Sequence, residues 1–250
     1  MKYVVFNWKM NPKTLTEANR LFTAVKKSAT GLKRVNTIIA PPAVFLHDLS
    51  RGYRGKSVAF SAQNVFYEQE GSYTGEMSPA QAKDAGAGYA VIGHAERRAM
   101  GESDEVVRRK VSAALQVHLK PIIAVGERER DEDGEYVSIV RAQIKAALTE
   151  VPPSKFKNVL LTYEPTWTIG MDDAPDKNSV HQMMLLVRKT LLELFGKDAM
   201  KQVRVLYGGS VNPENAADIF SVPDLDGVLI GRVSLVPAQL HEVLKIANRK

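Results

Sequence analysis

The segment Tyr163–Gly170 has the clearest chemical potential, because a carboxylate stands between an apolar run and a glycine-ended loop. The residues before Glu164 are apolar or β-branched, which favours a strand. Pro165 ends that strand and biases Glu164 toward an extended backbone. Trp167 and Ile169 are large apolar side chains in a loop, and we expect them to dock when the loop closes. The pattern predicts a base under a lid; the alternative is a proline-terminated strand with a surface carboxylate.

Residues of types common in active sites follow four further apolar segments. They are Asn7, Lys9, His94, Glu96, Gly209, Ser210, Gly231 and Arg232. Taken singly, each has an ordinary structural explanation, such as a solvated loop lysine for Lys9 or a hydrogen-bonded rim histidine for His94. Glu96 could form a structural ion pair with Arg97. Only a shared location would favour a common function.

Short apolar runs alternate with longer amphipathic stretches along the chain. The runs predict strands at Tyr3–Asn7, Asn36–Ala40, Val58–Ala62, Tyr89–Ile92, Pro121–Val125, Val159–Tyr163, Val203–Tyr207 and Gly227–Ile230. The stretches predict helices at Thr14–Ala29, Val44–Leu49, Pro79–Ala85, Ser103–Val117, Tyr136–Leu148, Asn178–Leu194, Asn215–Phe220 and Pro237–Asn248. Uniformly apolar strands are typical of a parallel sheet buried on both faces. We predict an α/β fold, a single (β/α)8 barrel domain over residues 1–250. A doubly wound open sheet is the alternative, although no G-x-G-x-x-G follows the first strand.

The barrel prediction gives the candidate residues a shared location. In such a barrel the loops that follow the strands meet at one end, where the active sites of this fold lie. The candidates follow the first, fourth, sixth, seventh and eighth predicted strands. We therefore expect them to converge, which weighs against separate structural explanations.

The whole chain resembles the triosephosphate isomerase family. The resemblance rests on motifs in the family's order: Asn7–Asn11, Ala62–Asn64, Tyr73–Glu76, Gly93–Arg98, Gly126–Glu127, Tyr163–Gly170, Tyr207–Val211 and Gly231–Leu235. It implies a TIM barrel that interconverts dihydroxyacetone phosphate and D-glyceraldehyde 3-phosphate, in glycolysis and gluconeogenesis. Such an enzyme is an aldose-ketose isomerase, an intramolecular oxidoreductase, and the resemblance implies neither a metal nor an organic cofactor.

The resemblance also implies catalytic roles. Isomerisation removes a proton from a carbon next to a carbonyl and returns it to the neighbouring carbon, which requires a base that serves both. Glu164 takes this role. His94 and Asn7 would donate hydrogen bonds to the oxygen that becomes negative, and Lys9 would supply a fixed cation. Glu96 would stand beside this group.

Phosphate binding is assigned by the same resemblance to backbone N–H groups, which hold an anion by fixed dipoles. The donors are those of Gly170, Gly209, Ser210, Gly231 and Arg232.

The lid and its latch form a further set. They comprise Pro165, Trp167 and Ile169 in the lid, with Glu127 and Tyr207 as the residues that latch its two states. A closed lid would exclude water from the enediolate.

The chain departs from the family's pattern at four places. Ala95 replaces a serine, and the loss of one neutral hydrogen bond to the base costs about 1 kcal/mol. The trailing half of the lid, Met171–Pro175, loses a glycine, exchanges a cation for an anion and gains a proline. Arg232 stands where glycine is usual in the phosphate turn. Ala124 replaces a common cysteine, which we expect to affect only packing.

Composition excludes several other classes. The chain has no cysteine, so disulfides and thiolate metal sites are excluded. Its formal charge of +6 is spread among acidic residues without a basic, aromatic-interleaved stripe, so we expect no nucleic-acid binding. No apolar run is long enough to span a membrane. The first residues read as a strand and not as a leader peptide, which favours a cytoplasmic location.

A long segment between the third strand and third helix, Phe66–Glu76, indicates a partner. By resemblance it inserts into a second copy, where Thr74 supports the active site, so we expect a homodimer. The alternatives are a tetramer and a loop that packs on its own barrel. Two further functions stay open at this point: a catalytically weakened homologue with a structural or interaction role, and an enzyme for a different phosphorylated sugar on the same barrel.

Overall fold

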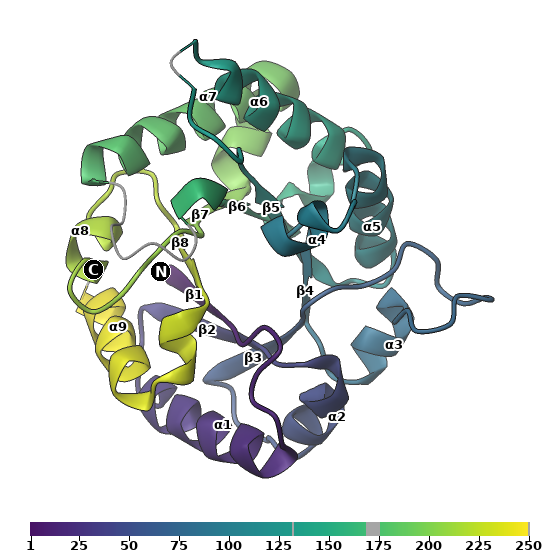
Figure 1. Cartoon of the computed structure of the whole chain (residues 1–250), viewed down its shortest axis with the longest axis vertical. Coiled ribbons are helices and arrows are strands. Elements are labelled where there is room, and N and C mark those ends of the chain that lie inside the picture. Colours follow the sequence, from purple (N-terminus) through teal and green to yellow (C-terminus); the bar gives the residue numbers. More distant parts are fainter. Residues whose placement is uncertain (132, 169–175, 250) are drawn as a thin grey trace.

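The computed structural model describes residues 1–131, 133–168 and 176–249. Eight parallel strands close into a barrel in chain order, with β1 pairing both β2 and β8 (Figure 1). They are β1 (Lys2–Asn7), β2 (Val35–Ala40), β3 (Val58–Ala62), β4 (Tyr89–Ile92), β5 (Lys120–Val125), β6 (Leu160–Tyr163), β7 (Arg204–Tyr207) and β8 (Gly227–Ile230). The barrel prediction is confirmed, each strand within one residue at either end. Because the sheet closes on itself, the open-sheet alternative is wrong.

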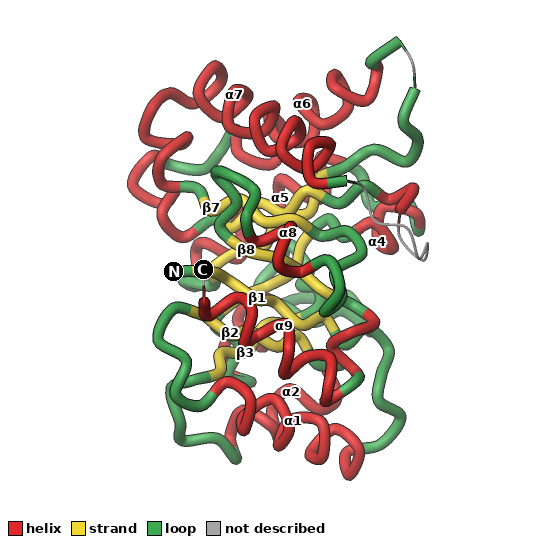
Figure 2. Tube along the Cα trace, turned by 90° about the vertical axis from the view of Figure 1, so that its left-hand side faces the viewer, coloured by secondary structure: helices red, strands yellow, loops and turns green. Residues whose placement is uncertain are grey.

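Helices surround the strands (Figures 1 and 2). The predicted ones are observed as α1 (Leu15–Ala29), α2 (Ala43–Arg51), α3 (Pro79–Asp84), α5 (Asp104–Gln116), α6 (Glu135–Leu148), α7 (Lys177–Gln202), α8 (Ala216–Phe220) and α9 (Pro237–Arg249). The largest difference is in α7, which was predicted to end at Leu194. Gly196 interrupts it with a non-helical φ of 81°, and a further helical stretch follows. No helix of the described residues is long and apolar enough to cross a membrane.

Four short elements have no counterpart in the prediction. They are α4 (Ala95–Ala99), η1 (Pro153–Asn158), η2 (Thr166–Thr168) and η3 (Arg232–Leu235). Three of them, α4, η2 and η3, begin in the loops that follow β4, β6 and β8, so they build the same end of the barrel. A single turn contains too few residues to show a hydrophobic period, which is why the sequence does not reveal them.

The barrel interior is a packed layer that forms the floor of this end. Every strand contributes to one small apolar cluster, made of Val5, Ile38, Ala40, Val91, Ile122, Leu160, Leu206 and Leu229 with Tyr3, Ala59 and Tyr89 against it. A larger cluster fills the space between strands and helices. Residues beyond the strand ends therefore stand on a rigid support. β1 begins at the end of the barrel opposite α4 (Figure 2).

A buried ion pair fixes the turn after β4. The Lys110 ammonium lies 2.9 Å from Glu102 Oε2, and both side chains are almost fully buried, at 2% and 3% exposure. Lys110 also donates to Asn64 Oδ1 at 2.8 Å. The other oxygen of Glu102 accepts a hydrogen bond from the backbone N–H of Gly93 at 3.2 Å. The pair therefore ties α5 to the residue just before His94.

We expect Lys110→Met to lower the free energy of unfolding by about 1 to 3 kcal/mol, because the buried Glu102 would lose its ammonium partner and keep only the Arg97 guanidinium at 3.3 Å. Urea unfolding followed by circular dichroism measures the change. The control is Lys145→Met, which removes an exposed lysine of α6 and should alter stability by about 0.5 kcal/mol or less. Equal stabilities of the two variants would contradict a structural role for the pair.

Candidate active site

A cavity of about 260 Å³ opens at the carboxyl end of the strands. Its lining includes six of the residues that the sequence singled out, namely Lys9, His94, Gly209, Ser210, Gly231 and Arg232. They come from the loops after β1, β4, β7 and β8. The expected convergence is therefore present.

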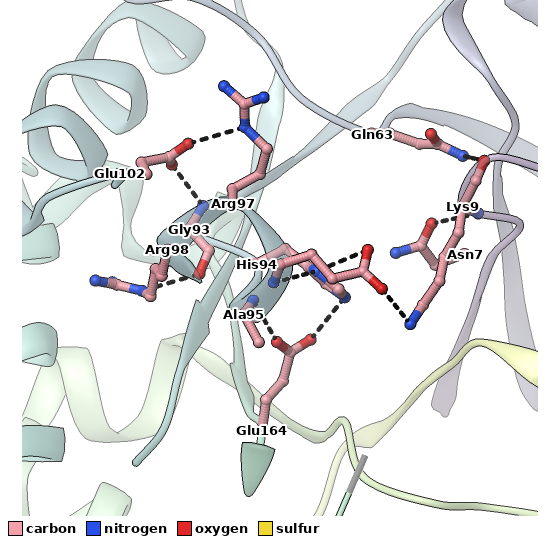
Figure 3. A network of polar contacts seen from close by, with 11 residues as sticks. Asn7, Lys9, Gln63, Gly93, His94, Ala95, Arg97, Arg98, Glu102 and Glu164 are labelled. Atoms are coloured by element: carbon pink, nitrogen blue, oxygen red, sulfur yellow. Dashed lines mark hydrogen bonds and ion pairs between the residues drawn. The ribbon is translucent and has the colours of Figure 1, made fainter. Parts of the chain in front are cut away.

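Glu164 follows β6 and is almost fully buried, with 1% exposure. Its Oε2 accepts a hydrogen bond from the backbone N–H of Ala95 at 3.2 Å. Its Oε1 lies 3.7 Å from His94 Nε2 and accepts no hydrogen bond from any described residue (Figure 3). The carboxylate is thus held by one oxygen and presents the other, unsatisfied oxygen beside the histidine.

Two glycines make room for Glu164, one for its side chain and one for its backbone. A Cβ on Gly208 would lie 2.7 Å from both Glu164 Cγ and Thr162 Cγ2. A Cβ on Gly126 would lie 1.8 Å from the Glu164 carbonyl oxygen. Gly208 thus lines the cavity and lets the side chain of Glu164 pack against its backbone.

We expect Gly208→Ala to lower kcat by about 100-fold, because displacing a catalytic group by about 1 Å costs that much. The matched control is Gly88→Ala, since a Cβ there would meet only the Phe60 carbonyl oxygen at an ordinary 3.9 Å. Steady-state kinetics of both variants, with circular dichroism to verify folding, makes the comparison. A folded Gly208→Ala variant with the kcat of Gly88→Ala would contradict the packing argument.

His94 is buried and caps the N-terminus of α4. Its Nδ1 accepts a hydrogen bond from the backbone N–H of Glu96 at 3.2 Å. Because Nδ1 acts as the acceptor, the single ring hydrogen of this tautomer lies on Nε2. Nε2 is the atom next to Glu164, so His94 presents a hydrogen-bond donor to the cavity.

Lys9 is held in an uncommon backbone conformation, with a φ of 52°. Its backbone N–H donates to Asn7 Oδ1 at 3.0 Å. Its carbonyl oxygen accepts from Gln63 Nε2 at 2.8 Å. Gln63 belongs to a motif that carried the resemblance, but no role was predicted for it. Its position directly after a strand end was the available signal.

The Lys9 ammonium forms an ion pair with Glu96, at 2.7 Å from Oε1. The alternative pairing of Glu96 with Arg97 is wrong, because the Arg97 guanidinium lies 3.3 Å from Glu102 Oε2. Glu96 therefore connects α4 to the loop after β1 (Figure 3), and it holds the ammonium of Lys9, which lines the cavity.

The first residues of the lid contact a buried carboxylate. Glu127 is fully buried, and its Oε1 accepts hydrogen bonds from Tyr163 Oη at 2.7 Å and from Trp167 Nε1 at 3.0 Å. The Arg130 guanidinium lies 3.3 Å from the same oxygen. Burial, with the neighbouring Glu127 charge, raises the pKa of Tyr163 well above its ordinary value. The structure thus places Trp167 on Glu127 and adds Arg130, which the sequence did not indicate.

Hydrogen bonds hold the two loops that follow β7 and β8 in place. Asn215 Nδ2 donates to the Ser210 carbonyl oxygen at 3.1 Å. The buried Ser234 hydroxyl lies 3.3 Å from the Asn7 carbonyl oxygen, which links the ends of β8 and β1. A Cβ on Gly231 would lie 3.2 Å from Lys9 Cε, so this glycine lets the lysine side chain cross the loop.

The structure describes only some of the remaining predicted residues. Ile169 and Gly170, with the altered segment Met171–Pro175, lie outside the described residues. Pro165 and Tyr207 are buried. Thr74 lies in the exposed loop between β3 and α3. Within the described parts of the chain, no group of three or more histidine, aspartate or glutamate side chains is arranged to hold a metal ion.

Comparison with known proteins identifies the family of this chain. The family model described as "Triosephosphate isomerase" matches residues 2–248. The chain belongs to the triosephosphate isomerase family. It is 38% identical to the triosephosphate isomerase of Lactiplantibacillus plantarum over 244 residues, which cover 97% of this chain and 96% of the relative. It is 40% identical to that of Chloroflexus aurantiacus over 240 residues, covering 95% and 96%. A third relative, from a Roseiflexus species, is 39% identical over 231 residues, covering 92% and 91%.

Membership of the triosephosphate isomerase family makes the substitution at Ala95 informative. The resemblance leads us to expect a serine at this position, and its side-chain hydroxyl is absent from alanine. In this chain the backbone N–H of Ala95 donates to Glu164 Oε2 at 3.2 Å. Glu164 therefore keeps a hydrogen-bond donor here that any residue at this position except proline would provide. Ala124 is buried in β5, in agreement with a packing role.

Proposed function

We infer that this chain is a triose-phosphate isomerase, which interconverts dihydroxyacetone phosphate and D-glyceraldehyde 3-phosphate in glycolysis and gluconeogenesis. Family membership over residues 2–248 supports the reaction. One observation carries the assignment of the site: the unsatisfied Oε1 of Glu164 lies 3.7 Å from Nε2 of the buried His94, beside the cavity that Lys9 lines. This arrangement combines a base, a hydrogen-bond donor and a cation.

In the proposed mechanism, Glu164 removes a proton from the carbon next to the substrate carbonyl. The electron pair of that C–H bond forms the enediolate double bond, and negative charge moves to the carbonyl oxygen. Glu164 then returns the proton to the former carbonyl carbon, while the hydroxyl proton on the carbon that was deprotonated passes to the charged oxygen and the new carbonyl forms at that deprotonated carbon. Because its side chain is buried and held at Oε2 only, the base is desolvated and keeps its other oxygen for this transfer.

Charge on the enediolate oxygen is stabilised by groups that are already in place. His94 Nε2–H donates to that oxygen, and the Lys9 ammonium supplies a positive charge nearby. Asn7 fixes the Lys9 backbone and lies at the same rim. Glu96 orients the ammonium through their ion pair. Preorganised donors of this kind need no rearrangement as the charge develops.

The phosphate group binds to backbone N–H groups of the loops after β7 and β8. These are the N–H groups of Gly209, Ser210, Gly231 and Arg232, with Gly170 from the lid. This placement agrees with the phosphate sites that barrels of this class carry after their last two strands. Pro165, Trp167 and Ile169 move with the lid, whereas Glu127 and Tyr207 hold it, and closure keeps water from the enediolate.

The active form is a homodimer built through the Phe66–Glu76 loop, and it works in the cytoplasm. This loop projects beyond the ring of helices (Figure 1), and its residues from Glu70 to Glu76 are exposed. Phe66 stacks on Tyr67 at 4.0 Å and contacts Tyr73 at 4.5 Å between ring centres, so the loop has its own aromatic base. In the dimer, Thr74 contacts the partner near its active site.

Sedimentation velocity tests the dimer. The chain should sediment as a dimer at micromolar concentration, and a variant in which residues 71–75 are replaced by a two-glycine link should sediment as a monomer. A wild-type monomer at the same concentration would contradict the proposal, and a tetramer would add a second interface to it.

A direct assay tests the reaction itself. Purified protein should convert glyceraldehyde 3-phosphate far faster than buffer alone, and inorganic phosphate should inhibit competitively because it occupies the phosphate loops. A rate equal to that in buffer would overturn the proposed function.

A further inference from the structure

Cationic side chains gather at the amino end of the barrel, where β1 begins and which lies opposite the candidate site (Figure 2). This end consists of the first residue of each strand and the connection that precedes it. Six of the eight strands have lysine or arginine there, and the exceptions are β4 and β8. The cations are Lys2, Lys33, Arg34, Arg54, Lys56, Lys120, Lys155, Lys157 and Arg204. They are scattered along the sequence, and closure of the barrel brings them to one face.

Few carboxylates offset these charges. The described ones in the same segments are Glu150, Asp224 and Asp226. Asp226 is paired with Arg188 of α7 at 2.6 Å, and Glu150 forms an ion pair with Arg108 of α5. Nine cations thus stand against three carboxylates, and the difference equals the formal charge of the whole chain, +6. The excess positive charge of the protein therefore lies at this end.

Most of these cations are available to a partner. Among the described residues, no carboxylate pairs with five exposed ones, namely Lys33, Arg34, Arg54, Lys56 and Lys157. The ammonium of Lys120 lies 5.4 Å from the centre of the Tyr89 ring. Burial, with the neighbouring Tyr3, raises the pKa of Tyr89 to about 12. This phenol therefore stays neutral and offsets none of the charge.

Hydrogen bonds fix the segments that carry the charges. The backbone N–H groups of Lys33 and Arg34 both donate to Asn248 Oδ1 of α9, at 3.1 and 3.0 Å. In the connection to β3, Tyr53 Oη accepts a hydrogen bond from the backbone N–H of Ser57 at 3.0 Å. A partner that binds this face therefore does not have to order these parts of the backbone, which would weaken its binding.

A wide basic face fits a planar anionic partner. Single-stranded nucleic acids bind in a basic groove that follows their backbone, with bases stacked on aromatic rings. Here the cations surround the end of the barrel instead of forming one line, and its aromatic residues Tyr3 and Tyr89 pack against the interior cluster. Clusters of about four to eight lysine and arginine residues are typical of surfaces that bind anionic lipid headgroups. The charge distribution therefore favours a lipid surface over nucleic acid.

We propose that the amino end of the barrel binds the surface of membranes that contain anionic lipids. The lysine and arginine side chains of this face attract the phosphate groups of the lipids, and no segment enters the hydrocarbon region. The attraction acts within one Debye length, about 10 Å at 0.1 M salt. Because the candidate site lies at the opposite end of the barrel, its cavity faces away from the bilayer. This inference goes beyond the proposed function and does not depend on it.

Co-sedimentation with lipid vesicles tests the proposal. At about 0.1 M salt, the wild-type protein should sediment with vesicles made of equal parts of phosphatidylglycerol and phosphatidylcholine, and should stay in solution with pure phosphatidylcholine. At about 1 M salt the Debye length falls to about 3 Å, and the binding should be lost. A wild-type protein that stays in solution with the anionic vesicles at the lower salt concentration would overturn the proposal.

A double variant locates the binding face. Arg34→Gln combined with Lys56→Gln should raise the Kd for the anionic vesicles about 30-fold, because each cation near an anionic bilayer contributes a factor of about five. The matched control combines Lys13→Gln with Arg20→Gln, which removes exposed cations from the loop after β1 and from the first half of α1. This control loses the same residue types and the same net charge, and its Kd should stay within about twofold of the wild type. Circular dichroism verifies that both variants fold.

Two further outcomes would overturn the proposal. Equal weakening in the two double variants would show that vesicles attract the protein through its overall charge and not through this face. A second arm replaces the vesicles with a single strand of polyuridylic acid. If that strand binds with the same dependence on Arg34 and Lys56 while the anionic vesicles do not bind, the partner is a nucleic acid and the membrane proposal is wrong.

Discussion

Glu164→Gln is expected to lower kcat for glyceraldehyde 3-phosphate conversion by about 10²- to 10⁴-fold, the usual contribution of a positioned general base. Glutamine has nearly the same shape, and its amide oxygen can still accept the hydrogen bond that Glu164 Oε2 takes from Ala95. It cannot accept a proton from carbon. The loss should therefore fall on kcat, with KM changing much less.

Stability distinguishes this loss from misfolding. Glu164 is a buried carboxylate with one oxygen lacking a hydrogen bond among the described residues, so a neutral amide should leave the melting temperature unchanged or higher. The control is Glu242→Gln in α9, an exposed glutamate that should affect neither kcat nor stability. A folded Glu164→Gln protein with kcat within threefold of Glu242→Gln would show that another group is the base.

Lys9→Met should lower kcat/KM by about 10²- to 10³-fold, the cost of removing one preorganised group that stabilises charge in the transition state. Methionine keeps the length of the side chain but loses the ammonium over the cavity. Glu96 would also lose its partner at 2.7 Å and leave an additional negative charge at the rim. Both changes disfavour a phosphate dianion and an enediolate, so KM should rise and kcat should fall together.

Lys13→Met is the matched control for this variant. It removes an exposed lysine four residues away on the same loop, with the same change in net charge. Its kcat/KM should stay close to that of the wild type. If both variants lost activity to the same degree, a general charge effect and not the position of Lys9 would be responsible.

Much of the fold and site is predictable from the sequence because the signals are local. Each strand is apolar on both faces, so even strands as short as Tyr89–Ile92 are visible from composition alone. Chemically useful residues such as Lys9, His94 and Glu164 directly follow these strands. Barrel topology then brings them together without any knowledge of side-chain geometry.

The features that the sequence did not reveal depend on contacts between distant segments. Gln63 supports Lys9 across 54 positions of sequence, and the buried Lys110 reads in the sequence as an ordinary helix-surface lysine. The role of Gly208 depends on the direction in which the Glu164 side chain points. No periodic pattern or fixed spacing in the sequence predicts these contacts.

Proton abstraction from carbon is the central claim, and hydrogen exchange measures it most directly. Dihydroxyacetone phosphate is incubated with the purified wild-type protein in D₂O, and proton NMR follows both the loss of signal at its C1 and the appearance of glyceraldehyde 3-phosphate. We predict exchange and conversion far above the rate in buffer, and the loss of both in Glu164→Gln. Wild-type protein that neither exchanges this proton nor forms product above the buffer rate would contradict the account.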